Sequence, residues 1–433
     1  MSYLIQSFFN KEKLQILSIV LIPLLLIIGP FLPDLIIVIL ALTYLIENIR
    51  DKNFYDFNKI KTAKILFIFW LWIIFISFFS DYVSISLKSS IPYLRFLLFS
   101  LFFYLVLKKY NKKIIQNIFM LLTLIYVALF CDTLLQFFSG KNIFGFVAQY
   151  PRMSSFFDEE LILGSFSIRF YPFWLALFFL SLKNQRGFLN LFIFLTVTTM
   201  VILLVILSGE RTSVFFVFLI LLCLLIFIKN FHKIKIIILI NSIIIFAIVL
   251  FTDNIFKKRL IDDTIKDFNV SKNITEINLF SETYQSHYYS AIKIFKDNWF
   301  IGSGPNSFRK KCQEKKYNMN EKSCSTHPHN IYVQLAAETG IFGLLFLILI
   351  FLNIILKLFS SLLKSSDKVN LNFHNAKIAL LVSFLISTFP FIPSGNFFNN
   401  WISAVYYYPL GLYFWISNFG SKEVNDIDFI KRS

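Results

Sequence analysis

The chain has 433 residues, of which 57% are hydrophobic and only 15% are charged. This balance excludes an ordinary soluble globular protein and is typical of a protein whose main solvent is lipid. A net charge of +17 would by itself suit a nucleic-acid partner, but the placement of the basic residues indicates membrane topology instead and no nucleic acid is expected.

Apolar runs long enough to cross a hydrocarbon core of roughly 30 Å recur along the sequence. Ile65–Ser80, Leu191–Leu207 and Phe342–Leu356 contain no charged residue. No small-residue cleavage site follows the first run, so we expect the N-terminus to be retained. The predicted fold is an all-α polytopic membrane protein with about twelve spanning helices, at residues 14–29, 33–48, 63–80, 89–107, 115–138, 161–182, 188–208, 212–229, 233–252, 330–356, 374–392 and 397–418.

Lysine and arginine are concentrated in alternate connections between these helices. Basic residues gather around positions 11–13, 50–64, 108–113, 183–186, 229–235, 357–377 and 422–432, whereas the intervening short connections hold only Lys88, Lys141, Arg152 and Arg211. By the positive-inside rule, both termini are predicted to face the cytoplasm.

One long polar connection lies on the predicted outer side and divides the chain into three parts. These are residues 1–252 with nine helices, the outer loop domain 253–328, and residues 329–433 with three helices and a short cytoplasmic tail. Tyr288, Ala291, Ile292 and Phe295 recur there at helical spacing, which predicts an amphipathic helix that packs on the bundle or lies at the lipid interface.

The same loop carries two further features. Cys312 and Cys324 are predicted to pair in an oxidising compartment, with two free thiols as the alternative. Gly302 and Gly304 lie in a turn-rich segment whose backbone amides are expected to meet an anion, although most such segments simply turn.

Arginines near the membrane are the first candidates for a binding site, because charge in a span is costly and usually functional. Arg95 and Arg169 fall in the outer halves of predicted helices, and Arg152 and Arg211 fall at the outer ends of two others. Together they are expected to line an outward cavity suited to a lipid diphosphate, since the guanidinium fork matches phosphate oxygens. Snorkelling, or pairing with nearby acids such as Glu210, is the alternative.

His329 is the candidate general base, at the expected start of the tenth helix. At 100° per residue, Gly340 is expected about 20° from His329 on the helix face, with Gly343 close by, so that a neighbouring helix packs tightly beneath the histidine. A helix N-terminus disfavours imidazolium and keeps the ring able to accept a proton. His327 is the competing candidate.

These residues carry a family resemblance. His329, Asn330, the nine residues 331–339, Gly340 and Gly343 resemble the histidine motif of the O-antigen ligase and polymerase family. Residues 298–308 resemble the glycine turn before that motif, and residues 151–157 and 208–211 resemble its arginine-led segments. The second histidine departs from the family pattern, and residues 253–281 match nothing in it.

The resemblance implies a metal-independent, inverting glycosyltransferase of the bacterial inner membrane that needs no cofactor. Its donor would be an undecaprenyl-diphosphate-linked glycan. Arg152 and Arg211 would act as catalytic residues on the diphosphate, and His329 would activate the acceptor hydroxyl. Arg169, Arg95, Asn330, Gly302 and Gly304 are the further candidates for substrate contacts.

The resemblance leaves two interpretations of the activity, which differ in the acceptor. An O-antigen ligase would use the lipid A core, and an O-antigen or exopolysaccharide polymerase would use another lipid-linked glycan. The histidine motif favours the ligase. A secondary transporter with twelve helices is the alternative from another class, but no pair of matching interrupted helices is found in two halves of the sequence.

Overall fold

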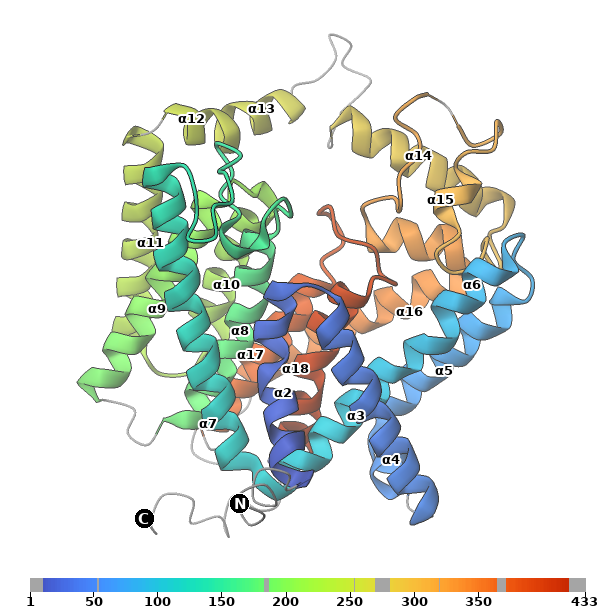
Figure 1. Cartoon of the computed structure of the whole chain (residues 1–433), viewed down its shortest axis with the longest axis horizontal. Coiled ribbons are helices and arrows are strands. Elements are labelled where there is room, and N and C mark those ends of the chain that lie inside the picture. The colour runs from blue at the N-terminus through green and yellow to red at the C-terminus, as the bar shows by residue number, and fades with distance from the viewer. Residues whose placement is uncertain are drawn as a thin grey trace.

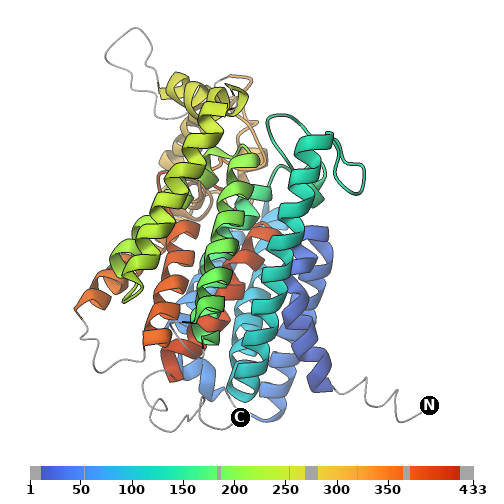
Figure 2. The same cartoon turned by 90° about the vertical axis from the view of Figure 1, so that its left-hand side faces the viewer.

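The computed structural model describes residues 11–52, 54–182, 187–252, 254–268, 281–318, 320–363 and 371–419. Within these ranges the regular structure is helical, apart from two isolated β-bridges. The helices pack side by side as one bundle (Figures 1 and 2). Predictions for the two chain ends and for residues 269–280 of the outer loop lie outside the described residues.

The first half of the bundle consists of α2 (Lys11–Ile28), α3 (Phe31–Arg50), α4 (Tyr55–Lys59), α5 (Lys61–Ser77), α6 (Val83–Ser90) and α7 (Leu94–Ser139). The second half consists of α8 (Leu163–Ser181), α9 (Phe188–Leu207), α10 (Arg211–Phe227), α11 (His232–Thr252), α16 (Ile331–Leu362), α17 (Leu371–Ser387) and α18 (Asn400–Phe419). Every predicted span lies mostly within one of these helices.

Helix α7 combines two of the predicted spans in one kinked run. Its backbone leaves helical geometry at Tyr110, where φ is −131° and ψ is 28°, and its two legs diverge from that point (Figure 1). Lys109, next to the kink, forms an ion pair with Glu12 in the first turn of α2 at 2.5 Å. The kink therefore lies at the end of the bundle where α2 begins, as expected for two crossings joined by a tight turn.

Among the described residues, five helical segments are long and apolar enough to cross a membrane: Phe31–Arg50, Val83–Ser139, Leu163–Ser181, Phe188–Leu207 and Ile331–Leu362. Large apolar side chains on the outer faces of the bundle, such as Leu42, Phe188 and Leu349, are half or more exposed. Such faces suit lipid and not water. The structure is thus that of a multi-pass membrane protein, while the count of twelve crossings and their orientation stay predictions.

The loop domain lies at one end of the bundle and is built from short helices (Figures 1 and 2). They are α12 (Asn254–Lys257), a π-helical turn η3 (Lys258–Asp262), α13 (Asp263–Phe268), α14 (Glu282–Asp297) and α15 (Phe308–Lys311).

Helix α14 confirms the predicted amphipathic helix. It packs against α16, and its buried face includes His287, Tyr288, Ala291 and Ile294, whereas Ile292 is exposed. The helix is therefore a packed element of the loop domain, as one of the two interpretations held.

A small core of its own holds the loop domain on α16. Ala291, Ile294, Phe308, Tyr317 and Ala337 are its buried members, together with Cys312. Cys312 forms a disulfide with Cys324, with Cα atoms 5.3 Å apart, as the sequence predicted.

Helix α16 is broken at Gly340, which corrects the predicted register. Gly340 has φ 69° and ψ −165°, and His329 has φ 59° and precedes the helix, which begins at Ile331. Because helical angles do not extend through either residue, the two do not share a helix face. A Cβ at Gly340 would lie 2.1 Å from the Phe300 carbonyl oxygen. The missing side chain therefore makes room for the backbone of the loop domain and not for a neighbouring helix.

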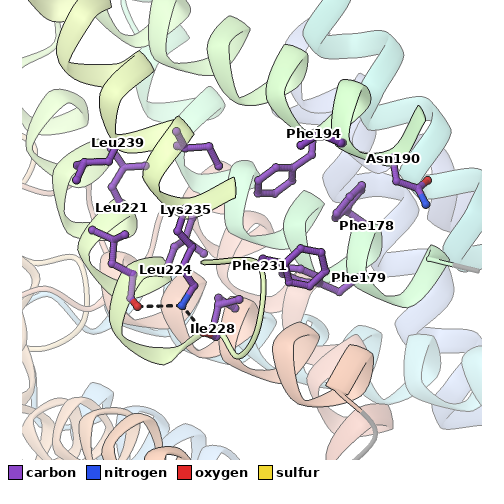
Figure 3. A pocket seen from close by; sticks show the side chains of 13 residues that line it. Phe178, Phe179, Asn190, Phe194, Leu221, Leu224, Ile228, Phe231, Lys235 and Leu239 are labelled. Atoms are coloured by element: carbon purple, nitrogen blue, oxygen red, sulfur yellow. Dashed lines mark hydrogen bonds between the residues drawn. The ribbon is translucent and has the colours of Figure 1, made fainter. Parts of the chain in front are cut away.

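An apolar pocket lies between α8, α9, α10 and α11 (Figure 3). The Lys235 ammonium projects into it and donates hydrogen bonds to the carbonyl oxygens of Leu225, at 2.9 Å, and of Ile228. These carbonyls belong to the last turn of α10, about 25 Å from its first residue at 1.5 Å per residue. The pocket is therefore at the opposite end of α10 from Arg211.

Candidate functional site

Arg152 and Arg211 are brought together by the turn that joins α9 to α10. Gly209 in this turn has φ 62°, and a Cβ there would lie 3.0 Å from both the Arg152 Cγ and the Pro151 carbonyl oxygen. Only glycine both adopts that backbone conformation readily and lets the segment carrying Arg152 approach so closely. Glu210 then precedes α10, and Arg211 is its first residue.

Arg152 is held by backbone carbonyls of its own chain. Its Nη2 donates to the Leu161 oxygen at 2.9 Å and its Nε to the Ser208 oxygen at 3.4 Å. Burial lowers the pKa of its guanidinium, attraction to Glu210 opposes this, and repulsion from Arg259 and Arg211 lowers the pKa further. Three cations that repel one another in a partly buried place favour the binding of an anion.

Arg259 is the member of this cluster that the sequence did not reveal. It lies in η3, and its Nε is buried with no hydrogen-bond partner. Thr264 of α13 accepts a hydrogen bond from Arg211 at 3.5 Å, so the same part of the loop domain covers Arg211. No motif marks Arg259 in the sequence, and only the fold brings it within electrostatic range of Arg152.

Glu210 is the acid that acts on Arg152. It interacts electrostatically with Arg152, but its Oε1 accepts hydrogen bonds from the backbone amides of Gly164 at 2.8 Å and Ser165 at 3.2 Å. The carboxylate thus caps the first turn of α8 and ties α8 to α10.

The other two predicted arginines lie elsewhere. Arg169 is 6% exposed within the bundle, with its guanidinium carbon 5.8 Å from the Phe216 ring centroid and 5.9 Å from that of Tyr406. Its Nη1 is buried without a hydrogen-bond partner.

Arg95 forms an ion pair with Asp34 at 2.8 Å and donates to the Asn400 side chain at 2.8 Å and to the Pro92 carbonyl at 2.7 Å. These contacts link α3, α7 and the start of α18. The expected substrate role of Arg95 does not fit them, because each nitrogen of its guanidinium is hydrogen-bonded to the chain, and a structural role is favoured.

His329 lies in a cluster of aromatic and imidazole rings. Its ring centroid is 4.1 Å from that of His327, 5.3 Å from that of His287 and 5.3 Å from that of Tyr284, while Ser325 Oγ is 3.2 Å from its Nε2. His287 and Tyr284 come from α14, and sequence reasoning missed both. The amphipathic pattern of α14 could have indicated His287, because a histidine on the buried face of a helix is a polar group in an apolar interior.

Burial lowers the pKa of His329 to about 4, and repulsion from His287 acts in the same direction. Burial also lowers the pKa of His327 to about 3 and lowers that of His287. All three rings are therefore neutral near pH 7, and a neutral imidazole can accept a proton. The sequence argument expected this from a helix N-terminus, whereas the structure assigns it chiefly to burial.

The glycine turn does not offer its amides to a ligand, contrary to expectation. The amides of Gly302, Ser303 and Gly304 donate to the carbonyl oxygens of Asn298, Ala337 and Glu338 at 2.8–2.9 Å. The turn thus satisfies two carbonyl groups that the break at Gly340 releases from helical bonding. Its conformation supports α16 directly below His329.

The carboxyl group that this segment does meet is that of Glu338. Its carboxylate is fully buried and accepts hydrogen bonds from the Phe308 amide at 3.0 Å and from the Gln334 side chain at 3.0 Å. Arg309 interacts electrostatically with both Glu338 and His327. This network fixes the loop domain against the first part of α16.

Asn330 and Gly343 also differ from expectation. The Asn330 side chain caps α16 by accepting from the amides of Tyr332 and Val333, and it donates to the Pro390 carbonyl at 2.7 Å, which gives it a structural role as a helix cap. A Cβ at Gly343 would lie 1.7 Å from Thr339 Oγ1, so this glycine accommodates a side chain of its own helix.

The arrangement defines a polytopic helical membrane protein with an arginine cluster and a histidine cluster beneath one loop domain. Residues 194–348 match the family model described as O-antigen ligase. This range runs from α9 into α16 and contains Arg211, Arg259 and His329. The resemblance seen in the sequence is thereby supported over this part of the chain. No curated protein matches the chain.

Proposed function

We propose that the protein is a glycosyltransferase of the bacterial inner membrane that transfers a glycan from undecaprenyl diphosphate to an acceptor hydroxyl on the periplasmic side. The observation that carries the proposal is the juxtaposition of the arginine cluster with the histidine cluster. Tyr284 connects them, because it contacts the His329 ring and interacts electrostatically with Arg152. An anion site next to a neutral imidazole suits transfer from a diphosphate to a hydroxyl group.

In the proposed reaction, Arg152 and Arg211 bind the donor diphosphate and stabilise the negative charge that develops on it, with Arg259 beside them. His329 accepts the proton of the acceptor hydroxyl, whose oxygen forms a bond to the anomeric carbon. The bond between that carbon and the diphosphate oxygen breaks, and the lipid diphosphate leaves with the electron pair. A single displacement of this kind inverts the anomeric carbon.

We propose the ligase reaction, in which the acceptor is the lipid A core. The match of residues 194–348 to the O-antigen ligase description supports this choice. Surface-glycan gels of a deletion strain distinguish the two acceptors. Loss of all polymer from the core indicates a ligase, whereas a single attached repeat indicates a polymerase. Glycan of normal length and amount on the core would contradict both.

Alanine variants of Arg152 and Arg211 test the site in the purified protein. Each should abolish transfer from lipid-linked donor while the protein still folds, and Arg211→Lys should recover only part of the rate, because lysine keeps the charge without the bidentate fork. Lys141→Ala is the matched control, since it removes an exposed cation outside the cluster. Wild-type rates in both alanine variants would refute the arginine assignment. Transfer that persists in EDTA is expected, because the arginines are proposed to stabilise the diphosphate.

A further inference from the structure

Tyr284 contacts the histidine cluster and lies within electrostatic range of Arg152. It is in the first turn of α14, is partly buried, and has its ring centroid 5.3 Å from that of His329 and 6.4 Å from that of His287. Its hydroxyl group is the part that lies within electrostatic range of Arg152. The tyrosine is therefore beside the proposed base and near the proposed diphosphate site.

In the proposed reaction, the first sugar of the donor lies between the arginines and His329. In a single displacement, the leaving oxygen and the attacking oxygen lie on opposite sides of the anomeric carbon. If the arginines hold the first and His329 activates the second, the sugar ring lies between them and next to Tyr284. We infer that Tyr284 is the aromatic platform for the sugar attached directly to the diphosphate, an inference that rests on the proposed function.

A tyrosine has the chemistry for this task. Its ring presents an apolar face to the C–H groups of a pyranose, and its hydroxyl group can hydrogen-bond the sugar, at the entropic cost of only two side-chain torsions.

The start of α14 is also held in place. Glu282 forms an ion pair with Lys322 at 2.7 Å, and Ser286 accepts a hydrogen bond from the Asn320 side chain at 3.0 Å. A rigid platform can position the sugar without being ordered on binding.

Two lipid probes separate a sugar contact from a diphosphate contact. Binding of undecaprenyl diphosphate, and of undecaprenyl diphosphate carrying one N-acetylhexosamine, is measured with the full-length protein in nanodiscs. Tyr284→Ala should weaken binding of the sugar-bearing lipid about ten-fold and leave binding of undecaprenyl diphosphate unchanged. Tyr284→Phe should retain most of the affinity, because it keeps the ring.

Tyr289→Ala is the matched control, since Tyr289 is on the same helix and 61% exposed. Its affinities for both lipids should equal those of the wild type. Equal losses for both lipids in Tyr284→Ala would assign Tyr284 to the support of Arg152 and overturn the inference, as would no loss at all. A wild-type protein that binds neither lipid would instead refute the proposed function itself.

Discussion

Replacing His329 by alanine removes the group proposed to accept the acceptor proton. General base catalysis contributes about 10² to 10⁴ in rate, so His329→Ala should lower kcat by about that factor. Donor binding should be unchanged, because the arginines and not the imidazole hold the diphosphate. His327→Ala is the control, since its ring lies 4.1 Å from that of His329 and it is the competing candidate for the base.

The lowered pKa of His329 also predicts how the rate depends on pH. Burial lowers the pKa of His329 to about 4, so the ring in the free protein stays neutral until the pH falls to that value. We expect kcat/KM to be level between about pH 8 and pH 5 and to halve near pH 4, whereas an exposed histidine would halve it near its ordinary pKa of about 6.5. Bound diphosphate is negative and favours imidazolium, so the acidic limb of kcat should lie at higher pH than that of kcat/KM.

Transfer assays with purified protein, lipid-linked donor and acceptor measure both parameters across this range. Near-normal kcat in His329→Ala, or a larger loss in His327→Ala, would refute the assignment of the base. An acidic limb near pH 6.5 in kcat/KM would show that the ring is not buried as the structure has it. An acidic limb of kcat/KM that stays unchanged in His329→Ala would show that another group titrates there.

Three other predictions concern the framework. Gly340→Ala should lower the unfolding temperature in detergent, because its Cβ would lie 2.1 Å from the Phe300 carbonyl oxygen. Gly145→Ala is the control for the backbone effect alone, because Gly145 also has a positive φ but has open space around it. An equal fall in unfolding temperature in both variants would exclude the clash as the cause. Cys312→Ser should destabilise the loop domain by about 2–4 kcal/mol, seen as faster limited proteolysis of that domain, and an unchanged rate would contradict this. A topology reporter fused near Lys316 should score as periplasmic, and a cytoplasmic score would overturn the proposed orientation.

The sequence alone determined the elements of this protein. Apolar runs and the alternation of basic connections located the helices, since a span must satisfy its backbone internally and is long enough to be recognised. The period of apolar residues likewise located α14, and the two cysteines of the outer loop were correctly paired. Arg152 and Arg211 were selected as candidates because charge at a membrane boundary is rare and costly, and their role stays a proposal.

Only the tertiary structure decided which side chains surround the reacting groups. The register argument for His329 and Gly340 failed because it assumed a continuous helix, whereas both residues have positive φ and the loop 299–304 replaces the broken hydrogen bonds. Arg259 and Tyr284 reach Arg152 from positions more than 100 residues away along the chain. Local periodicity carries no information about such contacts, because they depend on how the loop domain packs on the bundle.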